Sequence, residues 1–534
     1  MDNRTSYFEY ITLLLLVAII AFWGYFSYEY LPIFEFSDSA SDLVLSHHIY
    51  TTGNILPTDW YYSTELRVFY YHLVGVLCFF FTDDWHLVRF WENLILNIIL
   101  ATSIIAFLRA INLKENSYLV AAWVLLPISL GYFLVIQLFP AYIPYLAITF
   151  YILACLEYFY QGKSTLYLIP AALLAFLASL NGARHLAILT LPYFMLLGFL
   201  AVEYFYHNLR RYPFTLCLWR FISENARLIG GTLATGIMSL VGYAINVLYL
   251  AKIYTFTEQK AEFELISSEK LLEWGSLLGE VFGRIPQTDG FVAFLAEINV
   301  TPSESNLYFA YGFLAVSLLI LAWSVTVPNT ALRRYAILTC CNIALIVLIG
   351  MCTSQAINDR YMYPSLIMLL VLVGAVLGKL GRGKIYSLLF TLLLLLVAKD
   401  TASILAGWQD TPPRHYQNRQ IIVETLLENG YQSGYASYWF GNIFTVLSNG
   451  KLELWVYDGN IANISKWNQL KSHDDTTPTG KVFLLFTKEE LEEFPERAKL
   501  TADYLIYNDG TYFAYGFSSY HNLRKVVYNE ESQE

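Results

Sequence analysis

Residues 10–42 read YITLLLLVAIIAFWGYFSYEYLPIFEFSDSASD. The first part of this stretch is an apolar run of more than about twenty residues, long enough to cross a hydrocarbon core of about 30 Å as a helix. It lacks the small-residue cleavage site of a signal peptide, so we expect a retained membrane helix. Asp38 and Asp42 follow directly after it. Because a hydrophobic protein rarely places carboxylates beside the membrane without a use for them, they predict chemistry at the outer membrane face.

The composition is typical of a polytopic membrane protein. Hydrophobic residues make up 56% of the 534 residues and aromatic residues 17%. A formal net charge of -10 argues against nucleic acid as a partner. The six cysteines lie in or beside apolar segments, without metal-ligand spacing and with none after Cys352, so we expect any external domain to fold without disulfides.

Length and hydropathy predict about eleven transmembrane helices, near residues 10–34, 86–109, 118–138, 144–161, 166–181, 185–205, 228–252, 307–327, 335–352, 362–379 and 385–405. The run 68–82 is apolar but carries His72 and several aromatic residues over a shorter length, which favours a helix at the interface. With that run excluded and the N-terminus in the cytoplasm, the loops rich in Lys and Arg also fall on the cytoplasmic side.

This topology predicts two parts. Residues 1–405 form a membrane domain with two long external loops, 35–85 and 253–306, and residues 406–534 form a soluble extracytoplasmic domain. In the second part we expect helices at 417–429 and 441–447, strands at 434–439, 452–457 and 481–486, an acidic helix from Lys488, and a hairpin at 504–518 turning on Asn508-Asp509-Gly510. Alternating strands and helices predict a small α/β domain.

The first external loop carries candidate catalytic and binding residues. Asp38 and Asp42 are four residues apart, so on a helix both carboxylates project from one face. One could act as general base, or Ser37 or Asp38 could simply cap the helix. Farther on, the turn-rich, aromatic stretch 53–65 is suited to binding a sugar or lipid head group through Tyr61, Tyr62 and Glu65, although it could be an ordinary interfacial aromatic belt.

Two arginines stand out in short external loops, where positive charge should be scarce. Arg184 lies in Asn181-Gly182-Ala183-Arg184-His185 and Arg360 in Asn358-Asp359-Arg360-Tyr361. A guanidinium group at the mouth of a helix bundle can bind a phosphate in bidentate fashion; the alternative is a side chain that reaches toward lipid head groups. The adjacent pair His47 and His48 has no further metal ligands nearby, so we expect it to serve packing or to lie on the surface rather than to bind a metal.

Taken together, these motifs resemble the GT-C superfamily of polyprenyl-phosphate-sugar glycosyltransferases, which includes protein mannosyltransferases and aminoarabinose transferases. The resemblance covers about residues 1–405, as an ordered set of motifs: the Asp after the first helix, the Pro57-to-Glu65 block, the Asn-Gly-Ala-Arg-His break and the late Asp-Arg-Tyr. It implies that Asp38 activates the acceptor, that Glu65 is a second polar position of the loop, and that Arg184 and Arg360 face the lipid phosphate. The further expected substrate-binding residues are Asp42, Tyr61, Tyr62, Tyr142, His185 and Tyr361.

The resemblance also implies the reaction. We expect an inverting transfer of a sugar from a polyprenyl-phosphate donor to a cell-envelope glycan, lipid or protein acceptor, in the plasma membrane and among its lipids. Metal-using relatives carry an Asp-x-Asp pair where residues 139–144 contain no acid, so no metal cofactor is expected, with a divalent metal left open. A transporter or lipid flippase remains the alternative. A transporter needs charged residues near the membrane midplane to form its substrate or ion path, and the sequence has few such residues. A scaffold that presents the C-terminal domain is a third reading.

Overall fold

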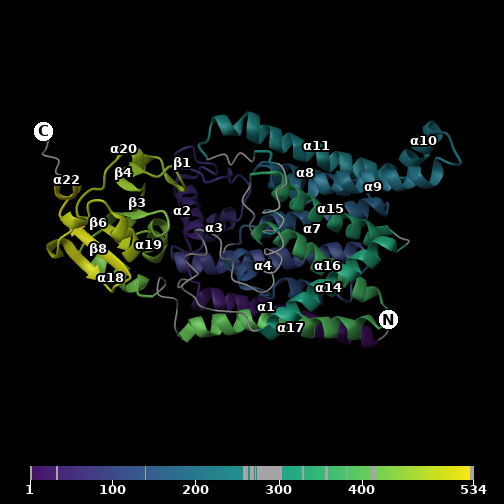
Figure 1. Cartoon of the computed structure of the whole chain (residues 1–534), viewed down its shortest axis with the longest axis horizontal. Helices are drawn as coiled ribbons and strands as arrows, with labels where there is room; N and C mark the ends of the chain where they lie inside the picture. Colours follow the sequence, from purple (N-terminus) through teal and green to yellow (C-terminus); the bar gives the residue numbers. More distant parts are fainter. Residues whose placement is uncertain are drawn as a thin grey trace.

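Long apolar helices dominate the first 410 residues of the computed structural model (Figure 1). The structure describes residues 3–31, 34–138, 140–256, 262–264, 270, 272, 304–327, 330–354, 359–380, 382–410 and 417–528, so most of the expected loop 253–306 lies outside the described residues. Within these described residues, seven helices are long and apolar enough to cross a membrane, and an eighth is counted if the 41° bend in α17 lies within one span. They are α1 (Asn3–Glu29), α4 (Trp85–Ala110), α7 (Ile143–Tyr160), α9 (Leu191–Asn208) with the π-turn before it, α11 (Ala226–Leu248), α14 (Glu304–Thr326), α15 (Thr330–Cys352) and the bent α17 (Gly383–Asp410).

The expected number of eleven is larger because three of the apolar runs form shorter helices. The run 118–138 breaks after α5 (Ser117–Val124) and resumes as α6 (Leu130–Phe133) and a π-turn. Pro127 explains this break, since proline lacks an amide hydrogen and disfavours helix in the residue before it. The other two are α8 (Leu168–Ser179) and α16 (Tyr363–Lys379). The apolar run 68–82 contains only α3 (His72–Phe79), whose eight residues are too few to cross the membrane.

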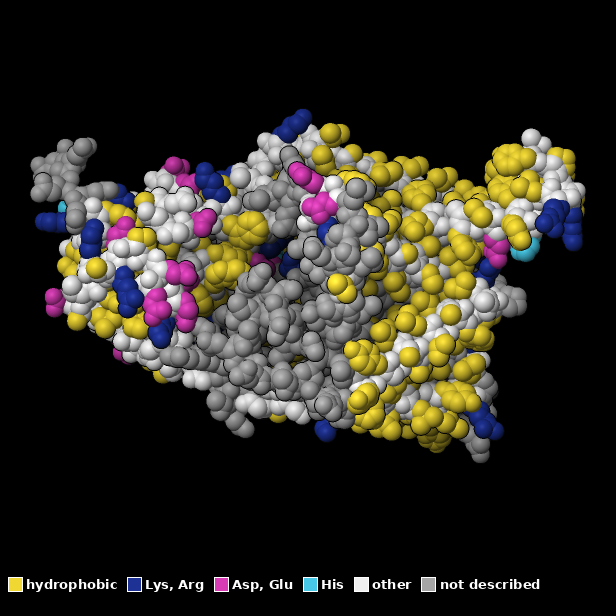
Figure 2. All heavy atoms as spheres, viewed as in Figure 1, with side chains coloured by type: hydrophobic (Ala, Val, Ile, Leu, Met, Phe, Trp, Pro, Cys, Tyr) yellow, Lys and Arg dark blue, Asp and Glu magenta, His cyan; other side chains and the backbone are white. Residues whose placement is uncertain are grey.

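The surface separates the two parts of the molecule. Hydrophobic side chains spread over the outside of the helices, while charged side chains gather over the C-terminal part (Figure 2). Large apolar residues such as Val202, Leu240 and Leu319 are more than half exposed along the long helices. A soluble protein would bury these side chains, so this surface is the one expected of a polytopic membrane protein.

The C-terminal part contains the expected α/β domain. Its six-stranded sheet has the order β4-β3-β2-β6-β8-β7. The strands are β2 (Ser433–Ser437), β3 (Glu453–Asp458), β4 (Asn460–Ile464), β6 (Val482–Thr487), β7 (Leu505–Asn508) and β8 (Tyr512–Phe517); the main helices are α18 (Arg419–Glu428), α19 (Gly441–Leu447), α21 (Lys488–Glu493) and α22 (Tyr520–Tyr528). Strand β2 pairs in parallel with β3 and β6, and the remaining pairs are antiparallel. The sequence predicted every one of these strands except β4, in which Ile461 is the one buried residue.

The α/β domain packs directly on residues 35–85, the loop predicted to be the first external loop. That loop contains α2 (Ser37–Thr52) and the two-residue strand β1 (Trp60–Tyr61), which pairs antiparallel with β5 (Gln469–Leu470) of the C-terminal part. Ile443 and Val446 of α19 share an apolar core with Leu43 of α2 and Trp85 of α4. The first external loop is therefore enclosed between the helices and the α/β domain (Figure 1).

Candidate active site

Asp38 lies in the first turn of α2 and faces the α/β domain. The helix begins after Phe36 without a capping side chain, so the alternative in which Asp38 caps the helix is not realised. Instead, the Asp38 carboxylate accepts a hydrogen bond through Oδ1 from the hydroxyl of Tyr438, which follows strand β2. Asp38 is only partly buried, which leaves part of the carboxylate accessible.

A network within the α/β domain holds Tyr438 in place. The Asn468 side-chain amide donates to the Tyr438 hydroxyl at 3.1 Å, and Asn442 donates to the Asn468 carbonyl at 3.0 Å and to Ser41 Oγ of α2 at 2.7 Å. Burial, and then the neighbouring Asp38 carboxylate, raise the pKa of Tyr438 well above its usual value. The hydroxyl therefore keeps its proton and remains a donor to Asp38 throughout the neutral range.

Asp42 has a different environment from Asp38. Its side chain is fully buried, with 0% exposure. It forms an ion pair with Arg67 and accepts a hydrogen bond from the Tyr71 hydroxyl. Arg67 also donates to Ser63 Oγ at 3.0 Å and lies 5.6 Å over the ring of Tyr70. The two carboxylates expected to project together thus separate into an accessible one and one that holds an arginine.

Arg184 and Glu65, predicted separately, form an ion pair. Arg184 Nε donates to Glu65 Oε1 at 3.0 Å, and the Tyr145 hydroxyl donates to Glu65 Oε2 at 3.2 Å. Both charged side chains are about a quarter exposed. The guanidinium carbon of Arg184 lies 4.9 Å from the ring centroid of Tyr142. Because this ion pair uses Nε, the two amino groups of Arg184 remain outside it.

The loop before Arg184 is fastened to the first external loop. The Asn181 side chain accepts from the backbone N–H groups of Val68 and Phe69 at 3.0 and 2.8 Å and donates to the Phe69 carbonyl at 2.8 Å. Gly182 follows with φ +129°, which side chains other than hydrogen rarely allow. The Asn-Gly-Ala-Arg motif therefore fixes the position of Arg184 relative to Glu65.

Arg360 joins the same group of residues. It lies in the short helix Asp359–Tyr361 before α16, with its guanidinium 5.4 Å from the ring centroid of Tyr361. It is within electrostatic reach of both Arg184 and Tyr142. The Tyr142 hydroxyl is buried and has no hydrogen-bond partner among the described residues. Two guanidinium groups and an unsatisfied hydroxyl thus lie together, an arrangement that an anion would stabilise.

Three of the expected substrate-binding residues lie apart from the group around Arg184. Tyr61 donates to Asp474 of the α/β domain, and Tyr62 is buried and donates to the Pro57 carbonyl at 3.1 Å. The His185 ring is fully buried and lines a small cavity between helices rather than the group around Arg184. His47 packs against Trp85 with 4.8 Å between ring centroids, which confirms its expected role in packing.

Sequence reasoning missed the partners of the predicted residues, namely Arg67, Tyr71, Tyr145 and Tyr438. It also missed a buried cluster in which Arg89 pairs with Glu35 at 3.1 Å and with Glu92. The sequence did hold one signal for this cluster: Arg89 and Glu92 are three residues apart on α4, a spacing at which opposite charges on a helix can pair. Within the described part of the chain, no three His, Cys, Asp or Glu side chains are grouped so as to hold a metal ion.

Comparison with known proteins adds one finding. No protein-family model and no curated protein sequence matches this chain. Among solved structures, the crystal structure of ArnT from Cupriavidus metallidurans bound to undecaprenyl phosphate matches with a TM-score of 0.52 and 11% sequence identity, over 94% of this chain and 97% of that one. This chain has the fold of ArnT. The expected architecture, a polytopic helical part followed by an α/β domain, is therefore confirmed at the level of the fold. The ArnT match extends over the α/β domain as well as the helices, because it covers nearly all of both chains.

Proposed function

We propose that the protein is an integral-membrane glycosyltransferase that moves a sugar from a polyprenyl-phosphate donor to a cell-envelope glycan, lipid or protein acceptor at the outer membrane face. The shared fold with ArnT, a protein crystallised with undecaprenyl phosphate, supports a donor of this class. Topology supports the outer face, because the loops rich in Lys and Arg then lie in the cytoplasm.

The observation that carries the proposal is the meeting of Arg184, Arg360 and Tyr142. Two like charges close together in a partly buried site repel each other unless an anion lies between them. A phosphate oxygen would satisfy the Tyr142 hydroxyl and accept charge-assisted hydrogen bonds from both guanidinium groups. The Glu65 carboxylate pairs with Arg184 and orients its guanidinium group.

Asp38 is the proposed general base. It is more accessible than Asp42, whose carboxylate is fully buried and already paired. Asp38 takes the proton of an acceptor hydroxyl while the acceptor oxygen attacks the anomeric carbon. The bond from that carbon to the phosphate oxygen breaks, and the lipid phosphate leaves with the electron pair. Arg184 and Arg360 stabilise the charge that develops on it. Attack from the side opposite the leaving group inverts the anomeric configuration.

Two further residues are proposed to hold the groups of the site in position. Asp42 is proposed to orient Arg67, and Tyr438 is proposed to orient Asp38 by donating to Oδ1. Tyr438 is thus a positioning residue supplied by the α/β domain, about 400 positions from Asp38 in the sequence.

The test uses full-length protein in detergent, a radiolabelled polyprenyl-phosphate sugar and an extract of envelope glycans. Transfer of label to the glycan fraction, with release of polyprenyl phosphate, supports the proposal. A protein that moves the intact donor across proteoliposome membranes without cleaving it would be a transporter, and the proposal would be wrong.

A further inference from the structure

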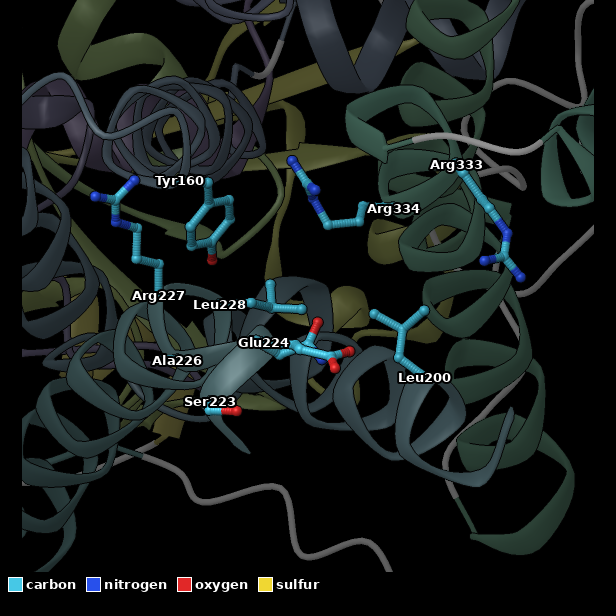
Figure 3. A pocket seen from close by; sticks show the side chains of 10 residues that line it. Tyr160, Leu200, Ser223, Glu224, Ala226, Arg227, Leu228, Arg333 and Arg334 are labelled. Carbon is cyan, nitrogen blue, oxygen red and sulfur yellow. The ribbon is translucent and has the colours of Figure 1, made fainter. Parts of the chain in front are cut away.

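A second polar pocket lies far from Asp38, at the opposite end of the helices. Its volume is about 540 Å³ and it lies where α9, α11 and α15 meet. Figure 3 shows Arg227 on one side and Arg333 with Arg334 on the other, with Tyr160 between them. Arg334 belongs to the start of α15 and Cys352 to its end, so the 23-residue helix separates the pocket from the Arg360 loop by about 30 Å. The pocket is therefore separate from the proposed active site.

Arginine side chains dominate the charged lining of the pocket. Three arginines line it against one carboxylate, Glu224. Arg334 forms an ion pair with Glu157 at 2.7 Å, and Arg333 forms one with Glu203. These contacts engage Nε and Nη2 of the two guanidinium groups and leave Nη1 of each outside them.

Arg227, unlike Arg333 and Arg334, forms no ion pair with a carboxylate of the described residues. It lies in the first turn of α11 and is exposed toward the pocket. Its guanidinium crosses Gly162, where a side chain would collide, because a Cβ would lie 2.3 Å from Nη1. Gly162 also has φ +76°, a backbone conformation that favours glycine, and a larger residue there would displace the Arg227 guanidinium.

The surroundings of the pocket are those of a membrane interface. Helix α10 (Phe214–Glu224) buries Cys217 and Phe221 and exposes Phe214, Trp219 and Ile222. An amphipathic helix of this kind lies in the plane of the membrane surface. It ends at Glu224 in the wall of the pocket, which is also lined by apolar Leu200 and Leu228. A ligand here would thus meet both positive charge and apolar surface.

We propose that this pocket binds the phosphate head group of an anionic membrane phospholipid. Arg227, Arg333 and Arg334 would hold the phosphodiester, and the apolar wall beside α10 would accept the start of an acyl chain. Basic pockets between transmembrane helices near the membrane surface suit such head groups, and the volume lies within the range of pockets that hold small ligands. The inference does not depend on the proposed enzymatic reaction.

The test measures thermal unfolding of the full-length protein in detergent with added phosphatidylglycerol, phosphatidylcholine or inorganic phosphate. Phosphatidylglycerol should raise Tm in a saturable manner, whereas the other two should not. Arg227→Gln should weaken the apparent affinity about tenfold, since it removes one charge-assisted contact. Ala226→Glu, which adds a negative charge to the pocket and leaves the arginines in place, should weaken it as well.

The matched control is Arg220→Gln, which removes an arginine of α10 that lies over the Tyr212 ring outside the pocket. It should respond to phosphatidylglycerol as the wild type does. Equal stabilisation by phosphatidylcholine, or an unchanged affinity in both pocket variants, would overturn the proposal. If inorganic phosphate raises Tm as much as phosphatidylglycerol does, the pocket binds free phosphate and the proposal of a lipid ligand is wrong.

Discussion

Replacing Tyr438 with phenylalanine removes one hydroxyl and tests whether the α/β domain takes part in catalysis. In the wild type this hydroxyl donates to Asp38 and accepts from Asn468 at 3.1 Å. Hydrogen bonds to charged groups contribute about 1.5–3 kcal/mol. If the proposed reaction needs Asp38 held in this orientation, that loss corresponds to a fall in kcat of about 10-fold to 100-fold.

The assay measures sugar transfer from a labelled polyprenyl-phosphate donor by the full-length Tyr438→Phe variant. The KM for the donor should change little, because the hydroxyl contacts Asp38 and not the arginines. Since burial and Asp38 raise the pKa of Tyr438 above its usual value of about 10, the deficit should persist across the neutral pH range.

Tyr507→Phe is the control for this prediction. It removes another tyrosine-to-aspartate hydrogen bond of the same domain, 3.1 Å long and made to Asp509, and should leave turnover near the wild-type value. If Tyr438→Phe turns over at the wild-type rate, or if both variants lose activity and Tm together, the reasoning about Tyr438 as a positioning residue is refuted.

Three further predictions concern the donor site, the topology and the domain boundary. Arg184→Ala and Arg360→Ala should each weaken donor binding about tenfold or more and lower turnover, measured by titration with a labelled polyprenyl phosphate; unchanged binding in both would remove the phosphate from this site. A reporter enzyme fused after Asp84 should be external and one fused after Lys114 cytoplasmic, and the reverse result would invert every later loop. A fragment of residues 415–534 should unfold cooperatively as a cysteine-free domain, less stable than in the full chain because the apolar side of α19 is then exposed; a non-cooperative melt would contradict the boundary.

Much of the fold followed from local sequence signals. Apolar runs of sufficient length predicted the long helices, and alternating strand and helix patterns predicted the α/β domain. The Asn-Asp-Gly turn was predicted in full: Asp509 accepts from the N–H groups of Thr511 and Tyr512 at 2.8 Å, as this turn chemistry requires. Hydropathy alone does not register where an apolar run breaks, and three of the eleven predicted runs form shorter helices, one of them interrupted at Pro127.

The site was predicted only in part, for a physical reason. Residues such as Asp38, Arg184 and Arg360 stand out because their charge is unusual for their position beside the membrane. Their partners do not stand out, since Tyr438 is one of many aromatic residues and meets Asp38 only through packing between distant segments. Local periodicity carries no information about such a contact, because it joins residues 400 positions apart. The different environments of Asp38 and Asp42 also arise from tertiary structure, through Arg67.

The central claim is that Asp38 is the general base of a glycosyl transfer, and turnover of Asp38→Asn tests it most directly. Asparagine preserves size and can still bond Tyr438, but it is not basic. The account predicts donor binding close to that of the wild type, with kcat lower by about 10² or more. Wild-type turnover by Asp38→Asn, at matched expression in a membrane assay, would contradict the account and show that the base lies elsewhere.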